Sequence, residues 1–337
     1  METTKQRIDF IDLAKGFCII LVVFTHVNTY FKLDYALKDV LASFRMPLYF
    51  ILSGLFFKKY SGFYDFVKRK ANNLLIPFFF FYLTLSFMLP NLLYLIGYNV
   101  RHTDKLGWNS IFNFIFYDQF SNSPIWFLLC LFWVNVIFYN ILIISGDKIW
   151  KIVISTFVCG ICGYALGRCE VQVYMYLDAA LTAVPFFCAG YLLKKYTNVL
   201  LPNKWDKYSI WFILFCFLFV YLFAAPMNFV GNRFPPNSFI QLYSCGIIGT
   251  LFVLLLSKKL KKHTLISYWG RYSVIVLCLH NPVIQVVVPF INRLPLDSWL
   301  SLILTLIIVM FSFLIIIPIM KRYFPYVTAQ KNLIPIS

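Results

Sequence analysis

The stretch LAKGFCIILVVFTHVNTY, residues 13–30, is long and apolar enough to cross a membrane, yet it carries Lys15 near its start and His26 near its end. A membrane-spanning helix needs about 20 mostly apolar residues. Ionisable side chains that face lipid are costly, so they turn towards the protein interior or a water-filled cavity. The stretch therefore predicts a transmembrane helix whose polar face packs against other helices.

The whole chain has the composition of an integral membrane protein. Of its 337 residues, 61% are hydrophobic and 13% are charged, whereas soluble domains are about 25% charged. The long, continuous apolar runs favour helices over barrel strands. We expect an all-α bundle of about ten transmembrane helices, forming a single domain over residues 1–337 with no appended soluble domain. The expected spans are 12–31, 36–57, 74–97, 123–145, 149–167, 174–193, 209–225, 238–257, 268–291 and 299–319.

The distribution of basic residues predicts the orientation of the bundle, because cytoplasmic loops carry an excess of Lys and Arg. With a cytoplasmic N-terminus, the inner segments hold twenty Lys and Arg residues and the outer loops hold six. Both termini are thus predicted to be cytoplasmic. The net charge of +17 is then explained mainly by the basic cytoplasmic loops and gives no support to a nucleic-acid partner. The six outer residues are Lys32, Arg101, Lys105, Arg168, Arg233 and Arg293.

Ionisable residues inside the predicted spans indicate a buried site. Lys15 and His26 are eleven positions apart, which makes three helical turns plus about 20° and places both on one face, about 16 Å apart along the axis. Arg45 lies near the middle of the second span, Asp178 in the outer third of the sixth and His280 in the ninth. Such residues within a membrane mark functional sites by default.

Each of these residues also has a structural interpretation. A lone intramembrane histidine can hydrogen-bond a neighbouring helix, and Arg45 can pair with Asp178 or with backbone carbonyls for folding. Lys15 can extend to the cytoplasmic surface. The basic run at 68–70 is typical of an inner loop, and Trp126 of an interfacial aromatic anchor.

Six sequence blocks occur in one order along nearly the whole chain: RIDFIDLAKGFCIILVVFTH at 7–26, FRMPLYFILSG at 44–54, KRKANNLLIP at 68–77, SPIWFLLCLF at 123–132, VPFFCAGYLLKK at 184–195 and ISYWGRYSVIVLCLHNPV at 266–283. Through these blocks the chain resembles the acyltransferase-3 family of bacterial membrane acyltransferases, especially the branch described as fucose 4-O-acetylase and related acetyltransferases.

The resemblance implies a multi-pass O-acetyltransferase of the bacterial cytoplasmic membrane. Such an enzyme takes an acyl group, by default acetyl, from cytoplasmic acetyl-CoA. It delivers the group to a hydroxyl of an extracytoplasmic or lipid-linked sugar of a surface polysaccharide. On this pattern His26 corresponds to the essential histidine of the family and Lys15 to its basic partner. Similarly placed residues in the other blocks are Arg45, Trp126, Asp178 and His280, and the expected substrate-binding residues are Trp126 and Asn281.

The chemistry of acyl transfer fits these residue types. A sugar hydroxyl needs a base with a pKa near neutrality, which His26 supplies, and Arg45 can stabilise the developing oxyanion. Asp178 either fixes the tautomer of a histidine or binds the acceptor, and His280 is a candidate second acid/base group. Direct transfer and an acyl-histidine intermediate are both open.

Coenzyme A carries phosphates, so its binding site should be basic and cytoplasmic. Basic residues with this placement are Lys15, Lys68, Arg69 and Lys70. The sequence departs here from the family pattern, because many members have an arginine shortly before the LLIP element where this chain has Asn72 and Asn73. No metal site is predicted, since the histidines and acidic residues are scattered rather than grouped at ligand spacing.

Two other functions remain as alternatives. A transporter of a glycan or small acylated metabolite would also have many spans and buried charges, but it is expected to show an internal repeat with interrupted helices, which we do not find. A different class of membrane acyltransferase, acting through one His and one Asn, would use His280 and Asn281. The outer segment 98–122 is expected to shape the access of the acceptor.

Overall fold

The computed structural model describes residues 8–97, 107–115, 122–197, 210–261 and 263–336. Over these ranges the chain is helical and contains no β-strand. Eight helical segments are long and apolar enough to cross a membrane. The prediction of an all-α, polytopic membrane protein is therefore confirmed. The eight segments are Asp9–Phe31, Phe63–Leu95, Ser123–Ile144, Ile149–Arg168, Tyr174–Tyr196, Phe239–Leu260, Ser273–Ile291 and Ser298–Tyr323.

The described elements follow one another along the chain. Short 3₁₀ turns (η3, η4 and η5) and two π-helical segments (η1 and η2) separate or join the α-helices. In order they are α1 (Asp9–Phe31), α2 (Lys38–Leu55), α3 (Phe63–Lys70), η1 (Ala71–Leu75), α4 (Ile76–Phe81), η2 (Tyr82–Met88), α5 (Leu89–Leu95), η3 (Trp108–Phe112), η4 (Ser123–Ile125), α6 (Trp126–Ile144), α7 (Ile149–Arg168), η5 (Tyr174–Tyr176), α8 (Leu177–Tyr196), α9 (Ile210–Phe223), α10 (Phe239–Leu260), α11 (Thr264–Arg271), α12 (Ser273–Ile291) and α13 (Ser298–Tyr323).

Each of the ten predicted spans contains a helix, but two of these helices are not typical membrane spans. α2 contains Lys38, Asp39 and Arg45 within 18 residues, and these charges reduce its apolar character. The described part of α9, which directly follows the gap at 198–209, has 14 residues, a length of about 21 Å against a hydrocarbon core of about 30 Å. The count therefore falls from about ten to eight among the described residues.

The third predicted span begins earlier than the sequence indicates. One continuous helix runs from Phe63 to Leu95, so the basic run 68–70 lies on a helix rather than in an irregular loop, and its place on the inner side stays a prediction. The π segments η1 and η2 each precede an α-helix with a proline in its first turn, Pro77 and Pro90 respectively. Because proline has no backbone N–H, the wider π turns let the helix continue past both residues.

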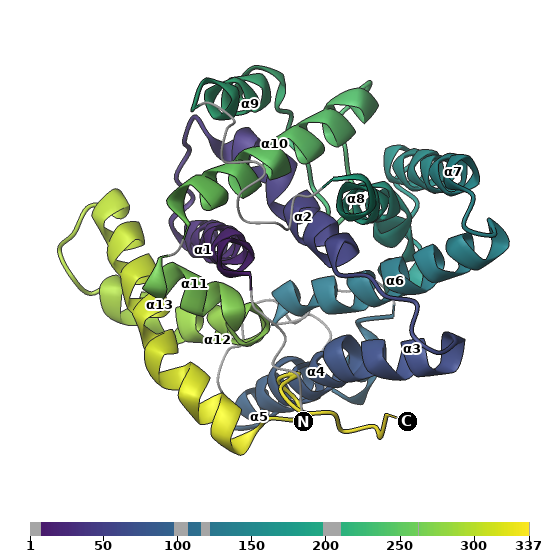
Figure 1. Ribbon diagram of the computed structural model, residues 1–337. Coiled ribbons are helices and arrows are strands. Elements are labelled where there is room, and N and C mark those ends of the chain that lie inside the picture. The colour runs from purple at the N-terminus through teal and green to yellow at the C-terminus, as the bar shows by residue number, and fades with distance from the viewer. Residues whose placement is uncertain (1–7, 98–106, 116–121, 198–209, 262, 337) are drawn as a thin grey trace.

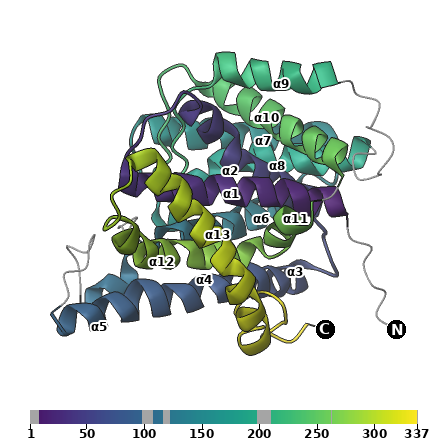
Figure 2. The ribbon, with the colours of Figure 1, turned by 90° about the vertical axis from the view of Figure 1, so that its left-hand side faces the viewer.

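Helix α1 lies at the centre of the bundle. Figure 1 shows it nearly end-on, surrounded by α2, α10, α11 and α12, and Figure 2 shows it crossing the middle of the molecule. Peripheral helices instead expose large apolar side chains, such as Trp150 on α7, Trp211 on α9 and Ile315 on α13. Exposed apolar surface of this extent suits a bilayer better than water. On the polar face of α1, Lys15, Thr25 and His26 are partly buried by these neighbouring helices.

Glycines let the backbones of α2 and α8 touch. A Cβ atom on Gly54 would lie 2.0 Å from the carbonyl oxygen of Phe187, and one on Gly190 would lie 2.0 Å from that of Ile51. Both distances are far below contact distance, so neither position has room for a side chain. Small residues at helix crossings permit such close packing in membranes. This crossing fixes the position of α2, the helix that carries Arg45.

A similar crossing joins α1 to α11. A Cβ atom on Gly16 would lie 2.1 Å from the carbonyl oxygen of Ile266, and one on Gly270 would lie 1.9 Å from that of Asp12. The inner half of α1, including Lys15, is therefore held against the short helix that precedes α12. Because α12 carries His280, this crossing also helps to align the two histidine-bearing helices.

We expect Gly54→Ala to destabilise the protein, because the added methyl group forces α2 away from α8. Overpacking of this kind costs about 1–3 kcal/mol, which thermal unfolding of the purified protein in detergent would show as a lower melting temperature. Gly231→Ala is the matched control, since its Cβ atom would meet no atom closer than 3.5 Å. Equal melting temperatures for both variants would contradict the close crossing.

Candidate active site

The two histidines singled out in the sequence lie in contact. His26 on α1 and His280 on α12 have ring centroids 5.0 Å apart, with the ring planes inclined by 57°. His280 is fully buried, whereas His26 is half-buried. The structure thus joins residues from the first and the sixth sequence block into one group, the histidine pair.

The backbone of α12 determines the tautomer of His280. Its Nδ1 atom lies 2.9 Å from the carbonyl oxygen of Val276. Since a carbonyl oxygen only accepts hydrogen bonds, Nδ1 carries a proton, and in the neutral ring Nε2 then carries a lone pair. Within the described residues the buried Nε2 has no hydrogen-bond partner. His280 therefore presents an unprotonated nitrogen in the interior of the bundle, and Val276, rather than Asp178, fixes its tautomer.

Arg45 reaches the same region from α2. One of its guanidinium nitrogens donates a hydrogen bond to the hydroxyl oxygen of Thr25, the residue before His26. The Thr25 hydroxyl donates to the carbonyl oxygen of Leu21 at 2.8 Å, which leaves its oxygen free to accept from Arg45. A second contact runs from the Cys18 thiol to the Arg45 carbonyl oxygen at 3.0 Å. Among the described residues Arg45 forms no ion pair with a carboxylate, so it brings a positive charge beside the histidine pair.

Asp178 and Trp126 belong to a second group of buried residues. Asp178 lies in the first turn of α8 and is fully buried, where it interacts electrostatically with Cys130 and Tyr176. The rings of Trp126 and Tyr176 have centroids 5.5 Å apart. The structure therefore unites Asp178 with the start of α6, separate from the ring contact between the histidines.

Asn122 links this second group to α12, and the sequence analysis did not single it out. Its side-chain amide donates to the Cys278 carbonyl oxygen at 2.7 Å, and its backbone N–H donates to the Ser86 hydroxyl at 3.2 Å. The bond to Cys278 lies two residues before His280. Asn281, the predicted substrate contact, follows His280 on α12 and is buried. Only the fold reveals the role of Asn122, because its partners are far away in the sequence.

A cavity of about 390 Å³ lies on the side of the bundle where α1 begins, which the charge distribution predicts to be cytoplasmic. Two of the four predicted donor-binding cations, Lys15 and Lys70, are among its lining residues. The Lys15 ammonium lies over the ring of Phe56 at 5.6 Å. The cavity extends to Val274 on α12, six residues before His280. We call it the inner cavity; its other lining residues are Tyr49, Leu52, Ser53, Phe56, Asn73, Leu74, Leu131, Asn135 and Ala329.

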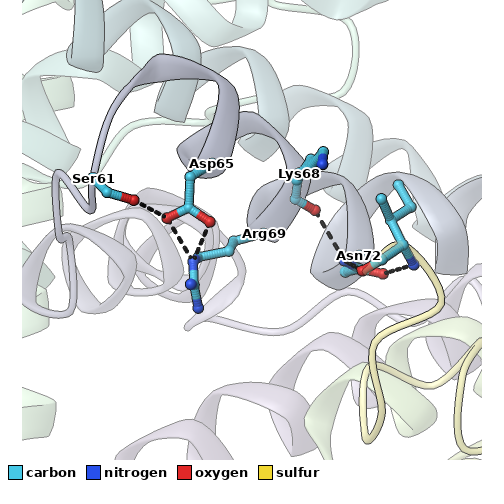
Figure 3. Close-up of polar contacts among 6 residues, drawn as sticks. Ser61, Asp65, Lys68, Arg69 and Asn72 are labelled. Atoms are coloured by element: carbon cyan, nitrogen blue, oxygen red, sulfur yellow. Dashed lines mark hydrogen bonds and ion pairs between the residues drawn. The ribbon is translucent and has the colours of Figure 1, made fainter. Parts of the chain in front are cut away.

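Lys68 and Arg69 do not line the inner cavity. Arg69 pairs with Asp65 at 3.0 Å in the arrangement of Figure 3, and its guanidinium lies over the ring of Tyr60 at 4.7 Å. The Lys68 ammonium lies over the ring of Tyr64 at 4.5 Å. Of the three successive basic residues, Lys70 is thus the one that the structure places against the cavity.

Asn72 anchors the C-terminal segment after α13. Its side-chain oxygen accepts from the backbone N–H groups of Leu333 and Ile334, both at 2.8 Å, and its amide nitrogen donates to the Ile334 carbonyl oxygen at 3.0 Å. The same nitrogen also donates to the Lys68 carbonyl oxygen (Figure 3). Ala329 of this segment lines the inner cavity. Asn72 is one of the two residues at which the sequence differs from the family pattern, and it therefore helps to build the cavity wall.

Comparison with known proteins supports an acyltransferase. The family profile described as an acyltransferase domain matches residues 8–321. No curated protein and no solved structure matches the chain. The match contains the histidine pair, Arg45 and all lining residues of the inner cavity except Ala329. Within the described residues, no three His, Cys, Asp or Glu side chains gather in a way that could hold a metal ion.

We expect Asn72→Ala to release the C-terminal segment, because the backbone N–H groups of Leu333 and Ile334 lose their buried acceptor. Hydrogen exchange followed by mass spectrometry would show at least about tenfold faster exchange in this segment, corresponding to the loss of about 1.4 kcal/mol of protection. Asn73→Ala is the control, since Asn73 is the exposed neighbour. Unchanged exchange in Asn72→Ala would contradict the anchoring role.

Proposed function

Because the chain belongs to the acyltransferase-3 family of membrane acyltransferases, we propose that it is an O-acetyltransferase of the bacterial cytoplasmic membrane. The acetyl donor is cytoplasmic acetyl-CoA, and the acceptor is a hydroxyl of an extracytoplasmic or lipid-linked sugar of a surface polysaccharide. The contact between His26 and His280, with ring centroids 5.0 Å apart inside the bundle, is the observation that carries this proposal. Neutral imidazole is the side chain best suited to move a proton at physiological pH.

The inner cavity supports binding of the donor from the cytoplasmic side. Lys15 and Lys70 line it and supply positive charge for the phosphates of coenzyme A. The thioester then extends along α1 and α12 towards the histidine pair. His26 lies about 16 Å beyond Lys15 along the helix axis, so the phosphate-binding end and the reacting end of the donor occupy different depths of the membrane.

The reaction needs a base and a positive charge at the reacting carbonyl. His26 takes the proton of the acceptor hydroxyl while its oxygen attacks the thioester carbonyl carbon. Arg45, held beside His26 through Thr25, stabilises the negative charge on the carbonyl oxygen. When the intermediate collapses, the carbon–sulfur bond breaks, and the departing thiolate takes up the proton from His26. The products are the sugar ester and free coenzyme A.

His280 acts as a positioning residue in this proposal. Its tautomer is fixed by Val276, and its ring packs against that of His26. The contact limits the orientations that the His26 ring can adopt, and the Nε2 lone pair offers an acceptor for a proton on His26. Trp126, Asp178 and Asn281 are assigned to the binding of the acceptor, on the outer side of the histidine pair.

We expect His26→Ala and His26→Gln to abolish acetyl transfer, because both remove the base. General-base catalysis typically contributes about 10²–10⁴-fold to the rate. The assay uses purified protein in membranes, radiolabelled acetyl-CoA and isolated surface glycans of the host, and it measures alkali-labile incorporation of label. His263→Ala is the control, since this exposed histidine caps α11 and lies outside the site.

The His26 variants separate the proposal from its nearest alternative. Full activity in both variants would overturn the role of His26. Activity lost in His280→Ala but kept in His26→Ala would instead favour the acyltransferase mechanism based on His280 and Asn281. Equal melting temperatures of the variants and the wild type would establish that the loss is chemical rather than structural.

For His280 we expect a lower kcat with an unchanged KM for acetyl-CoA. His280→Leu should reduce kcat by about tenfold to a hundredfold, because misplacement of a catalytic group has effects of this size. His280→Gln should retain more activity than His280→Leu, since its amide can still present a polar atom towards His26. A higher KM with an unchanged kcat would show that His280 serves donor binding instead.

A further inference from the structure

A second cavity, of about 430 Å³, lies at the opposite end of α1, which the charge distribution predicts to be the outer side. This size falls within the range of small-molecule sites. None of the residues proposed above for catalysis or donor binding lines it. We call it the outer cavity; its lining residues are Thr25, Asn28, Thr29, Lys32, Leu33, Asp34, Tyr35 and Lys38.

Two lysines give the outer cavity unpaired positive charge. Lys32 and Lys38 are both exposed, and neither takes part in an ion pair within the described part of the chain. Membrane topology does not account for them, because the positive-inside bias depletes Lys and Arg on the outer side. Two lysines that line one outer cavity therefore call for another explanation, and a negatively charged ligand supplies it.

The turn that carries Lys32 is held in a fixed shape. The Asn28 side chain donates to the Leu33 carbonyl oxygen at 2.8 Å and accepts from the Leu33 backbone N–H at 3.0 Å. Lys32 itself has a left-handed backbone, with φ of 54°, a conformation that favours glycine and costs a lysine about 1–2 kcal/mol. The lysine side chain is thus kept on the cavity wall at an energetic cost.

A chain of polar contacts leads from the outer cavity to the reaction centre. Tyr35 and Thr25 both line the outer cavity, and Tyr35 interacts electrostatically with Arg45. Thr25 in turn accepts from Arg45 and directly precedes His26. A ligand in the outer cavity would therefore approach the histidine pair from the side opposite the inner cavity.

The outer cavity also carries negative charge, which restricts the ligands that it can bind. Asp34 lines it and Asp39 interacts with Tyr35. Among the residues that line the cavity, the two cations Lys32 and Lys38 outnumber the single carboxylate of Asp34. A sugar offers hydroxyl groups that can donate to Asp34, while its anionic group can lie between the two lysines. The lining thus suits a ligand that is both hydroxylated and acidic.

We propose that the outer cavity binds the charged end of the acceptor and that Lys32 and Lys38 recognise a carboxylate or a phosphate there, while Trp126, Asp178 and Asn281 keep the role proposed above, contact with the sugar that is acetylated. The identification of this ligand as the acceptor rests on the proposed function, whereas the anion site itself does not. The acceptor is thereby restricted to acidic sugars or to sugars linked through phosphate. The acceptor hydroxyl reaches His26 from the outer side and receives the acetyl group there.

The test measures binding separately from transfer. Surface glycans of the host are separated into neutral and anionic fractions, and their affinities for the protein in nanodiscs are determined by microscale thermophoresis. We expect the anionic fraction to bind wild type at least about tenfold more tightly than the neutral fraction. We expect K32Q/K38Q to lose this preference, because a hydrogen bond to a charged group is worth about tenfold or more in affinity.

Two single variants test whether misfolding, rather than loss of charge, explains the lost preference for the anionic fraction. Asp34→Asn removes the opposing negative charge but keeps a side-chain oxygen that can accept from a sugar hydroxyl, so it should tighten binding of the anionic fraction, a change that a damaged fold would not produce. Arg293→Gln removes an exposed basic residue elsewhere on the outer side and should leave binding unchanged. Competition by glucuronate or by glucose 1-phosphate then identifies the bound group as a carboxylate or as a phosphate.

Each result decides the proposal. Equal affinity for both fractions, unchanged binding in K32Q/K38Q, or no competition by either small anion would overturn the anion site. Acetyl-CoA binding is measured on the same samples and should be unaffected by the lysine variants. If the anionic fraction binds but receives no acetyl group while acetyl-CoA also binds, the proposed function fails and the anion site stands.

Discussion

The interior of a lipid bilayer offers no hydrogen bonds to a protein, so polar groups on a membrane helix must find partners within the protein. This constraint governs the position of α1. Its face with Lys15, Thr25 and His26 cannot lie against lipid, and the helix accordingly occupies the centre of the bundle (Figure 1). The surrounding helices supply what the bilayer lacks. Arg45 bonds Thr25, and His280 packs against His26.

Polar groups in such a setting have to be positioned by the backbone, because a misplaced one remains unsatisfied. The reciprocal glycine contacts of Gly54 and Gly190 hold α2 against α8, and α2 carries Arg45. In α12 the Val276 carbonyl oxygen orients the His280 ring. This backbone carbonyl oxygen thus orients the histidine ring, as a carboxylate does beside many catalytic histidines. The fixed orientation of the buried His280 ring thus follows from the helix that carries it.

The two ends of α1 meet different chemical surroundings. At the inner end, Lys15 and Lys70 face a cavity whose wall includes Ala329 of the C-terminal segment, held in place by Asn72. Arg69 is occupied by Asp65, so the positive charge of the inner cavity is carried by fewer residues than the basic run suggests. At the outer end, Lys32 and Lys38 line a separate cavity. His26 lies on α1 between these two ends and His280 packs against it from α12, an arrangement that suits the transfer across the membrane proposed above.

Several properties were predictable from the sequence because they depend on local composition and period. The long apolar runs identified a polytopic helical protein, the spacing of Lys15 and His26 identified the polar face of α1, and the six ordered blocks identified the acyltransferase-3 family, which the match over residues 8–321 confirms. The apolar pattern could not locate the start of the helix at Phe63, because its first turns, Phe63–Lys70, are rich in charged residues and a π turn then precedes Pro77.

The contacts that build the candidate site were decided by the tertiary structure. Three of these contacts join residues that are distant in the chain. They are the ring contact of His26 with His280, the hydrogen bond from Asn122 to Cys278, and the hydrogen bonds between Asn72 and the C-terminal segment. Which of many possible helix faces come together depends on how closely two backbones can approach. That approach is set by where glycines from separate helices coincide, as at Gly54 and Gly190, and no single segment of sequence contains this information.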